Sequence, residues 1–170
     1  MKFNTPLTEI LKFANTHTDR KHFEISINVI SEVTFQPLEK VISFFLSDYG
    51  IKPIFNIGDY DQLGFEAFNL EKIESPNPQY LYVHSSTLKY FAKASGIPNC
   101  DVSEKFKEII DEYLNNIRKI INTAGSAYVV VNLFELPPYR LRGSYSARSG
   151  IINIIQYVNN EILILSRENE

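Results

Sequence analysis

The stretch Ile25–Tyr49, ISINVISEVTFQPLEKVISFFLSDY, decides the fold class of this 170-residue chain. It begins with an apolar run that is typical of a strand covered on both faces, and it ends with apolar residues at helical spacing. Between the two lies the short polar turn Ser31–Thr34. In an open α/β sheet, ligands usually bind where a strand ends and a helix begins, so this turn is the first candidate for a site.

The same order of strand and then helix recurs along the chain. We expect strands at residues 23–30, 51–57, 80–84 and 127–133, and helices at 36–49, after 85, from 101 or 103 to 123, and at 151–165. Gly50 follows the predicted helix at 36–49 and can take the left-handed conformation that ends a helix. Residues 1–22 are expected to hold an earlier helix, starting at Thr5–Pro6, and a linker. This alternation predicts one α/β domain over residues 1–170, with a parallel sheet between layers of helices.

Composition excludes several classes of protein. Hydrophobic residues make up 44% and charged residues 22%, as in globular proteins. The net charge of −3 provides no general attraction to nucleic acid or an anionic membrane. Cys100 is the single cysteine, so neither an internal disulfide nor a CxxC metal site is expected. No apolar run is long enough to cross a bilayer and no signal peptide is recognised, which indicates a cytoplasmic protein; no metal or cofactor is expected.

Nucleotide-binding motifs are missing, but one turn is acidic. Neither GxGxxG nor GxxxxGK[ST] occurs in the sequence. Asp59 and Asp61 follow the second predicted strand and imitate the DxD of haloacid dehalogenases, in which the first Asp is the nucleophile. The later turns do not supply the lysine and acid that complete such a site. The alternative is a solvated turn with local hydrogen bonds, so both aspartates remain candidates for ligand binding.

Ser31 and His84 are the candidate catalytic pair. They end the first and third predicted strands, and a serine nucleophile needs a base within hydrogen-bond reach. The alternative for His84 is a structural role. Serine and threonine at a helix start more often act as caps, and Thr34 is the candidate cap for the helix at 36–49.

The other candidate ligand-binding residues lie at the ends of later strands. They are Thr34, Ser85, Asn132, Glu135, Arg140 and Arg142. The arginines belong to a long loop over residues 134–149, which favours a functional or partner-contacting role. They could hold a carboxylate or phosphate through paired hydrogen bonds, or they could pair with neighbouring acids in solvent.

Two stretches carry a family resemblance. In residues 30–62 and 129–162, the matching positions are Ser31, Thr34, Pro37, Leu38, Gly58, Tyr60, Asp61, Gln62, Asn132, Phe134, Pro137, Gly143 and Asn159 or Asn160. With these residues the chain resembles the N-terminal region of the FkbH-like proteins. The resemblance implies an SGNH-hydrolase-like domain with a flavodoxin-like, three-layer α/β/α fold and four to five strands. It also places Ser31 at the nucleophile position of that fold.

The family further implies partners and a pathway. In such proteins this region precedes a haloacid-dehalogenase-like domain that is associated with loading glyceryl or similar acyl units onto a carrier protein. They occur in polyketide and surface-polysaccharide biosynthesis. An acyl carrier protein and a haloacid-dehalogenase-like domain are therefore the expected partners, whereas nucleic acid and a membrane span are not expected.

The chain departs from the SGNH pattern at each catalytic motif. Gly-Asp-Ser, Gly-x-Asn-Asp and a terminal Asp-x-x-His are all missing, and the sequence stops where a fifth strand would be expected. The chain is therefore either the N-terminal part of a longer protein or a short stand-alone relative. We expect a weakly active or inactive binding or docking domain. The first alternative is an esterase or O-acyltransferase, with Ser31 as nucleophile, His84 as base, and Asn132 or backbone N–H groups near Ser31 as oxyanion donors. The second is a structural or oligomerisation domain.

Overall fold

The structure, a computed structural model, describes residues 23–58, 63–64, 79–87, 90, 102–135 and 151–169. Its elements are β1 (Phe23–Ser31), α2 (Gln36–Ser47), β2 (Ile51–Ile57), β3 (Tyr80–His84), α5 (Val102–Thr123), β4 (Tyr128–Val131) and α6 (Ile151–Glu168). The predicted N-terminal helix lies outside these residues. The predicted strands are confirmed, and for β2 and β3 the predicted bounds match the observed ones.

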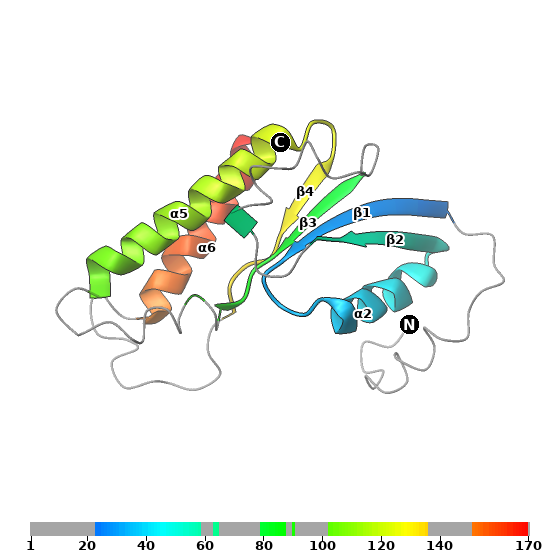
Figure 1. Cartoon of the computed structure of the whole chain (residues 1–170), viewed down its shortest axis with the longest axis horizontal. Coiled ribbons are helices and arrows are strands. Elements are labelled where there is room, and N and C mark those ends of the chain that lie inside the picture. Colours follow the sequence, from blue (N-terminus) through cyan, green and yellow to red (C-terminus); the bar gives the residue numbers. More distant parts are fainter. Residues whose placement is uncertain are drawn as a thin grey trace.

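The four strands form one parallel sheet in the order β2-β1-β3-β4 (Figure 1). The β1 run is buried from Ile27 to Ser31, as expected for a central strand with helices on both faces. In the sheet register, Ser31 of β1 stands opposite His84 of β3. The prediction of a flavodoxin-like α/β fold is therefore confirmed.

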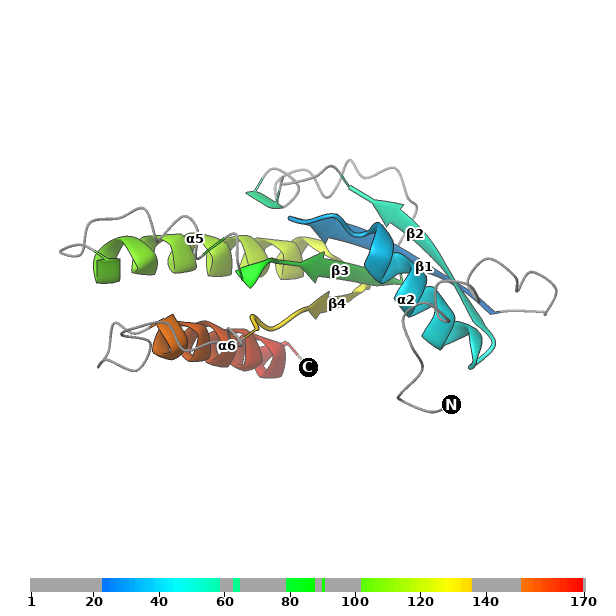
Figure 2. The same cartoon turned by 90° about the horizontal axis from the view of Figure 1, so that it is seen from below.

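Helices cover the sheet on two faces. On one face, Ile27 and Val29 of β1 pack with Phe35 and the apolar side of α2. On the other, Ile30 of β1 and Leu81 and Val83 of β3 pack against α5 and α6. Figure 2 shows α5 and α6 alongside each other, with α2 set against β1 and β2. The first turn after each strand is thus left at the carboxyl edge of the sheet.

The start of α2 corrects one prediction. Thr34 is exposed and does not cap the helix; the N-cap residue is Phe35, which makes no side-chain cap hydrogen bond. Phe35 is only 1% exposed and packs in the cluster under α2, so its ring rather than a capping hydroxyl occupies the start of the helix. The helix also ends at Ser47, two residues before the predicted Tyr49. Gly50 has a φ of +69°, which confirms the predicted left-handed residue.

The described part of the sheet has four strands, and its two edges are β2 and β4. The last helix, α6, continues to Glu168, three residues beyond the predicted Leu165. Among the helices that the structure describes, none is both long enough and apolar enough to cross a membrane.

Candidate functional site

The carboxyl edge of the sheet brings Ser31, His84, Ser85 and Asn132 together. β1 and β3 are paired so that Ser31 Oγ lies 3.4 Å from His84 Nδ1. At the neighbouring strand end, the Asn132 N–H donates to the Val83 carbonyl oxygen at 3.3 Å. The parallel topology therefore places side chains from three strands at one edge, as the sequence predicts.

The Ser31 hydroxyl is engaged within its own turn. Ser31 Oγ donates to the Val33 carbonyl oxygen at 2.7 Å and accepts the Val33 N–H at 3.3 Å, and Ser31 is buried. Such short-range hydrogen bonds are typical of serine at strand and helix ends. A hydroxyl has one proton, and in this geometry the proton of Ser31 points to the Val33 carbonyl oxygen rather than to His84. The hydroxyl is therefore not oriented as an activated nucleophile would be.

His84 lies in a half-buried, largely aromatic setting. Its ring stacks on Tyr82 at a centroid distance of 5.8 Å and meets the edge of Phe35 at 6.1 Å. Burial lowers the pKa of His84, and the negative charges of Glu135 and Glu32 oppose that shift. The neutral imidazole is therefore favoured near pH 7.

Glu32 is a member of the site that the sequence reasoning missed. Its carboxyl group is buried at the end of β1, where Oε1 accepts a hydrogen bond from the Tyr90 hydroxyl at 3.0 Å. The Glu32 N–H also donates to the His84 carbonyl oxygen at 3.1 Å. Burial first, and the charge of Glu32 second, hold the pKa of Tyr90 far above its usual value. The one available signal was an acidic residue directly after a buried strand.

Two more hydroxyl groups lie inside this edge. Ser85 and Tyr113 are both buried. Burial raises the pKa of Tyr113, while the neighbouring Ser85 hydroxyl lowers it by a smaller amount and Glu32 raises it further. The interior end of the site thus combines the buried Glu32 carboxyl group with the Tyr90 hydroxyl that donates to it, and with the buried hydroxyls of Tyr113 and Ser85.

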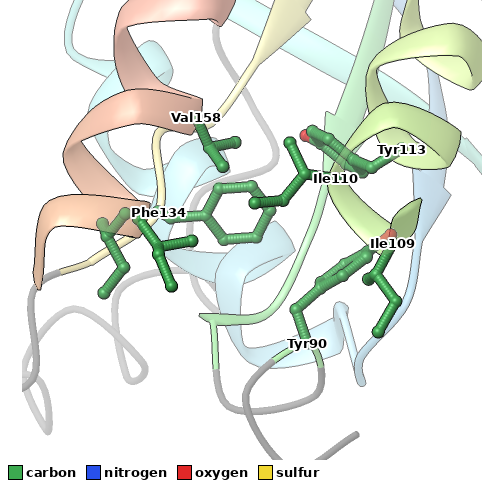
Figure 3. A pocket seen from close by; sticks show the side chains of 8 residues that line it. Tyr90, Ile109, Ile110, Tyr113, Phe134 and Val158 are labelled. Carbon is green, nitrogen blue, oxygen red and sulfur yellow. The ribbon is translucent and has the colours of Figure 1, made fainter. Parts of the chain in front are cut away.

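An apolar pocket backs this polar group. The rings of Tyr90, Tyr113 and Phe134 stand 5.1 to 5.4 Å apart, centroid to centroid, in edge-to-face contacts. Figure 3 shows how side chains from α5 and α6 complete the pocket around them; its lining residues are Tyr90, Ile109, Ile110, Tyr113, Phe134, Ile154, Ile155 and Val158. The Tyr90 ring is therefore fixed on its apolar side while its hydroxyl reaches Glu32.

Asparagine side chains hold the strand ends in place. Asn132 Oδ1 accepts the Ser85 N–H at 2.7 Å, and its Nδ2 donates to the carbonyl oxygens of Ser85 at 3.0 Å and Leu133 at 3.2 Å. Asn159 of α6 bonds both the N–H and the carbonyl oxygen of Phe134, at 2.8 and 2.9 Å. The amide of Asn132 is thus occupied by the backbone rather than directed at a bound oxyanion.

The remaining predicted site residues are either exposed in the structure or lie outside the residues that it describes. Glu135 is exposed, close enough to His84 to act on its pKa, and its N–H donates to Thr87 Oγ1 at 2.8 Å. Thr34 is exposed on the turn after β1. Asp59, Asp61, Arg140 and Arg142 lie outside the described residues, so their place in the site stays a prediction.

Comparison with known proteins shows the fold. No protein-family model matches the sequence, and no curated protein matches it. The fold is similar to a crystal structure described as the N-terminal part of the protein BF1531 from Bacteroides fragilis, containing a phosphatase domain complexed with Mg. The TM-score is 0.75 at 16% sequence identity, over 97% of this chain and 43% of that one. The chain thus spans less than half the length of that protein's structure.

Proposed function

We propose that this chain is an SGNH-like docking domain of the FkbH-like type, which binds a partner at the carboxyl edge of its sheet and has little or no hydrolase activity. The observation that carries the proposal is the 2.7 Å hydrogen bond from the Ser31 hydroxyl to the Val33 carbonyl oxygen. This bond points the hydroxyl proton at a carbonyl oxygen instead of at a catalytic base. The neutral His84 ring then has a packing role beside Phe35 and Tyr82.

The proposed partners follow from the resemblance and from the structural neighbour. BF1531 contains a phosphatase domain, which agrees with a haloacid-dehalogenase-like partner domain for this chain. The second partner is an acyl carrier protein that bears a glyceryl or similar acyl unit in polyketide or surface-polysaccharide biosynthesis. Arg140 and Arg142 are the proposed anion-binding groups, because guanidinium groups bind carboxylate and phosphate through paired hydrogen bonds.

A hydrolase assay tests the first half of the proposal. Wild type and Ser31→Ala are treated with a fluorophosphonate probe and with p-nitrophenyl acetate. We expect equal, background labelling and turnover in both proteins. Labelling of the wild type that disappears in Ser31→Ala would establish a serine hydrolase instead. That alternative has one observation in its favour, the 3.4 Å approach of Ser31 Oγ to His84 Nδ1.

A binding titration tests the second half. The probe is an acyl carrier protein with its phosphopantetheine arm, titrated into wild type and into Arg140→Ala/Arg142→Ala. We expect the double variant to bind at least tenfold more weakly, because two cations are removed from the proposed dock. The matched control is Arg118→Ala/Arg167→Ala, which removes the same charge from exposed positions on α5 and α6. Unchanged affinity in the first pair, or no binding by the wild type, would remove carrier docking from the proposal.

A further inference from the structure

The apolar pocket between α5 and α6 lies within the carboxyl edge but has no role in the proposed function so far. Two of its lining residues belong to that edge, because Tyr90 follows β3 and Phe134 follows β4 (Figure 3). Ile109 of α5 and Ile154 of α6 line it as well and are only half-buried. The pocket is therefore continuous with the surface at which a partner is proposed to dock, and its rim is in contact with solvent.

The aromatic walls of the pocket are held in place by contacts outside it. The Tyr90 hydroxyl donates to Glu32 at 3.0 Å. The side-chain amide of Asn159 bonds the N–H and the carbonyl oxygen of Phe134 at 2.8 and 2.9 Å. Tyr113, which is buried, meets both rings edge to face at centroid distances of 5.2 and 5.1 Å. The rings cannot close on the space without losing these contacts, so the pocket is pre-formed, as ligand sites usually are.

The walls are apolar toward the space that they enclose. No polar atom of the lining side chains faces it. The Tyr90 hydroxyl is bonded to Glu32 instead, and the Tyr113 hydroxyl has Ser85 as its neighbour. A space of this kind stays dry, so an apolar group that enters it displaces no hydrogen-bonded water. A hydroxyl group that entered would lose its hydrogen bonds to water and find no replacement, which is unfavourable.

The volume of the pocket limits what it can hold. The space is about 20 Å³, and roughly 10–15 Å³ is enough for one water-sized group. A methyl group is of that size, whereas an aromatic ring is not. The rest of a longer ligand would lie at the rim, beside Ile109 and Ile154. The pocket is therefore suited to the end of a narrow aliphatic chain.

We propose that this pocket binds the terminal methyl group of a short aliphatic acyl unit, such as butyryl, and does not accept a glyceryl unit. The inference rests on the proposed function for the carrier that brings the acyl unit, whereas the kind of acyl unit follows from the walls and the volume of the pocket. A glyceryl unit ends in hydroxyl groups, which the apolar walls would leave unpaired. The pocket is then the part of the edge that selects the acyl unit.

Methyl nuclear magnetic resonance tests the pocket without a carrier protein. The probes are the butyryl and glyceryl thioesters of N-acetylcysteamine, each titrated into the full chain with labelled isoleucine methyl groups. We expect saturable shifts of the Ile109 and Ile154 methyl signals with the butyryl thioester and none with the glyceryl thioester. No saturable shift with the butyryl thioester would show that the space is a packing void only and would overturn the proposal. Equal shifts with both thioesters would also overturn it.

Larger side chains at the rim test the assignment to this pocket. Ile109→Phe and Ile154→Phe place a ring at the rim from α5 and from α6, so the test does not depend on the folding of one variant. Each should weaken binding of the butyryl thioester about fourfold or more, the effect of no longer burying one methyl group. The control is Ile121→Phe, a half-buried isoleucine of α5 that does not line this pocket. Equal weakening by the control would contradict the assignment.

Titration with loaded carrier proteins separates this inference from the proposed function. The butyryl carrier should bind about fourfold more tightly than the carrier with a free phosphopantetheine arm, and the glyceryl carrier should bind no more tightly than the free one. A free carrier that binds while the butyryl group adds nothing would overturn the role of the pocket alone. Binding of the butyryl thioester without binding of any carrier would support the pocket and remove carrier docking from the proposed function.

Discussion

At the scale of single residues, Glu32 shows how a charged side chain is accommodated inside the carboxyl edge. It is 4% exposed and accepts the Tyr90 hydroxyl. Burying an ionisable group is unfavourable unless hydrogen bonds compensate. The Tyr90 ring is fixed by Tyr113 and Phe134, so the hydroxyl is held in position for the carboxyl group. Packing on the apolar side thus supports the polar contact.

Tyr90→Phe isolates that contact. The substitution keeps the ring and removes the hydroxyl that donates to Glu32. Because a hydrogen bond to a charged group contributes about 1.5–3 kcal/mol, we expect the free energy of unfolding in urea to fall by about that amount. The control is Tyr49→Phe, whose ring is 81% exposed. An effect of Tyr90→Phe no larger than that of Tyr49→Phe would contradict this account of Glu32.

His84 is the second test at this scale, by nuclear magnetic resonance titration. Its pKa should lie below the ordinary value of 6.5, because burial disfavours the imidazolium. Glu135→Gln should lower it further, since the Glu135 charge raises it. Glu24→Gln, at the other end of β1, is the control and should leave the pKa unchanged.

The same shift makes stability depend on pH. Between the lowered folded pKa of His84 and 6.5, the unfolded chain binds more protons than the folded one. The free energy of unfolding is therefore highest, as far as His84 is concerned, above pH 6.5. It falls as the pH drops from 6.5 to the lowered pKa of the folded protein. A pKa of His84 above 6.5 would reverse the sign and contradict the prediction.

At the scale of elements, Asn159 joins α6 to the segment after β4. Its side-chain amide bonds both backbone groups of Phe134, as a neighbouring strand would. The Phe134 ring is buried against Tyr90 and Tyr113. One amide on a helix therefore fixes where a core aromatic ring enters the site.

Asn159→Ala should lower the free energy of unfolding by about 2–3 kcal/mol, because two hydrogen bonds are lost at a buried backbone position. Asn160→Ala provides the matched control, since Asn160 is exposed on the same helix; a change within about 0.5 kcal/mol is expected there. Chemical denaturation of the two variants measures both. Equal effects would show that Asn159 does not join these elements.

At the scale of the whole molecule, the sheet separates two apolar clusters. Phe35 belongs to the cluster under α2, and Ile120 belongs to the cluster under α5 and α6. Both side chains are buried almost completely. Because the strands between them are shared, the two clusters should unfold together.

Phe35→Ala and Ile120→Ala test this coupling. We expect losses of about 3–5 and 2–5 kcal/mol respectively, each in a single unfolding transition. The two residues share no contact, so the losses should add in the double variant if it still folds. Two separate transitions in either single variant, measured by circular dichroism and fluorescence, would show that the layers are independent.

The sequence by itself determined the order and type of the described elements. A short-range pattern, apolar residues at strand or helix spacing, predicts β2 and β3 to the residue. Gly50 takes its positive φ for an equally local reason, the absence of a side chain. The meeting of Ser31 and His84 at one edge followed from the parallel order alone. None of these depends on how a particular side chain packs.

Only the tertiary structure decided what the site residues do. Glu32 and Tyr90 are 58 residues apart, and Asn159 rather than Asn160 reaches Phe134 across 25 residues. Thr34 was predicted to cap α2, but the N-cap residue is the buried Phe35. These contacts join groups that are distant in the sequence and that compete for the same hydrogen-bond partner or the same space in the core. The spacing of residues along the chain therefore does not predict them, because they are decided by tertiary packing.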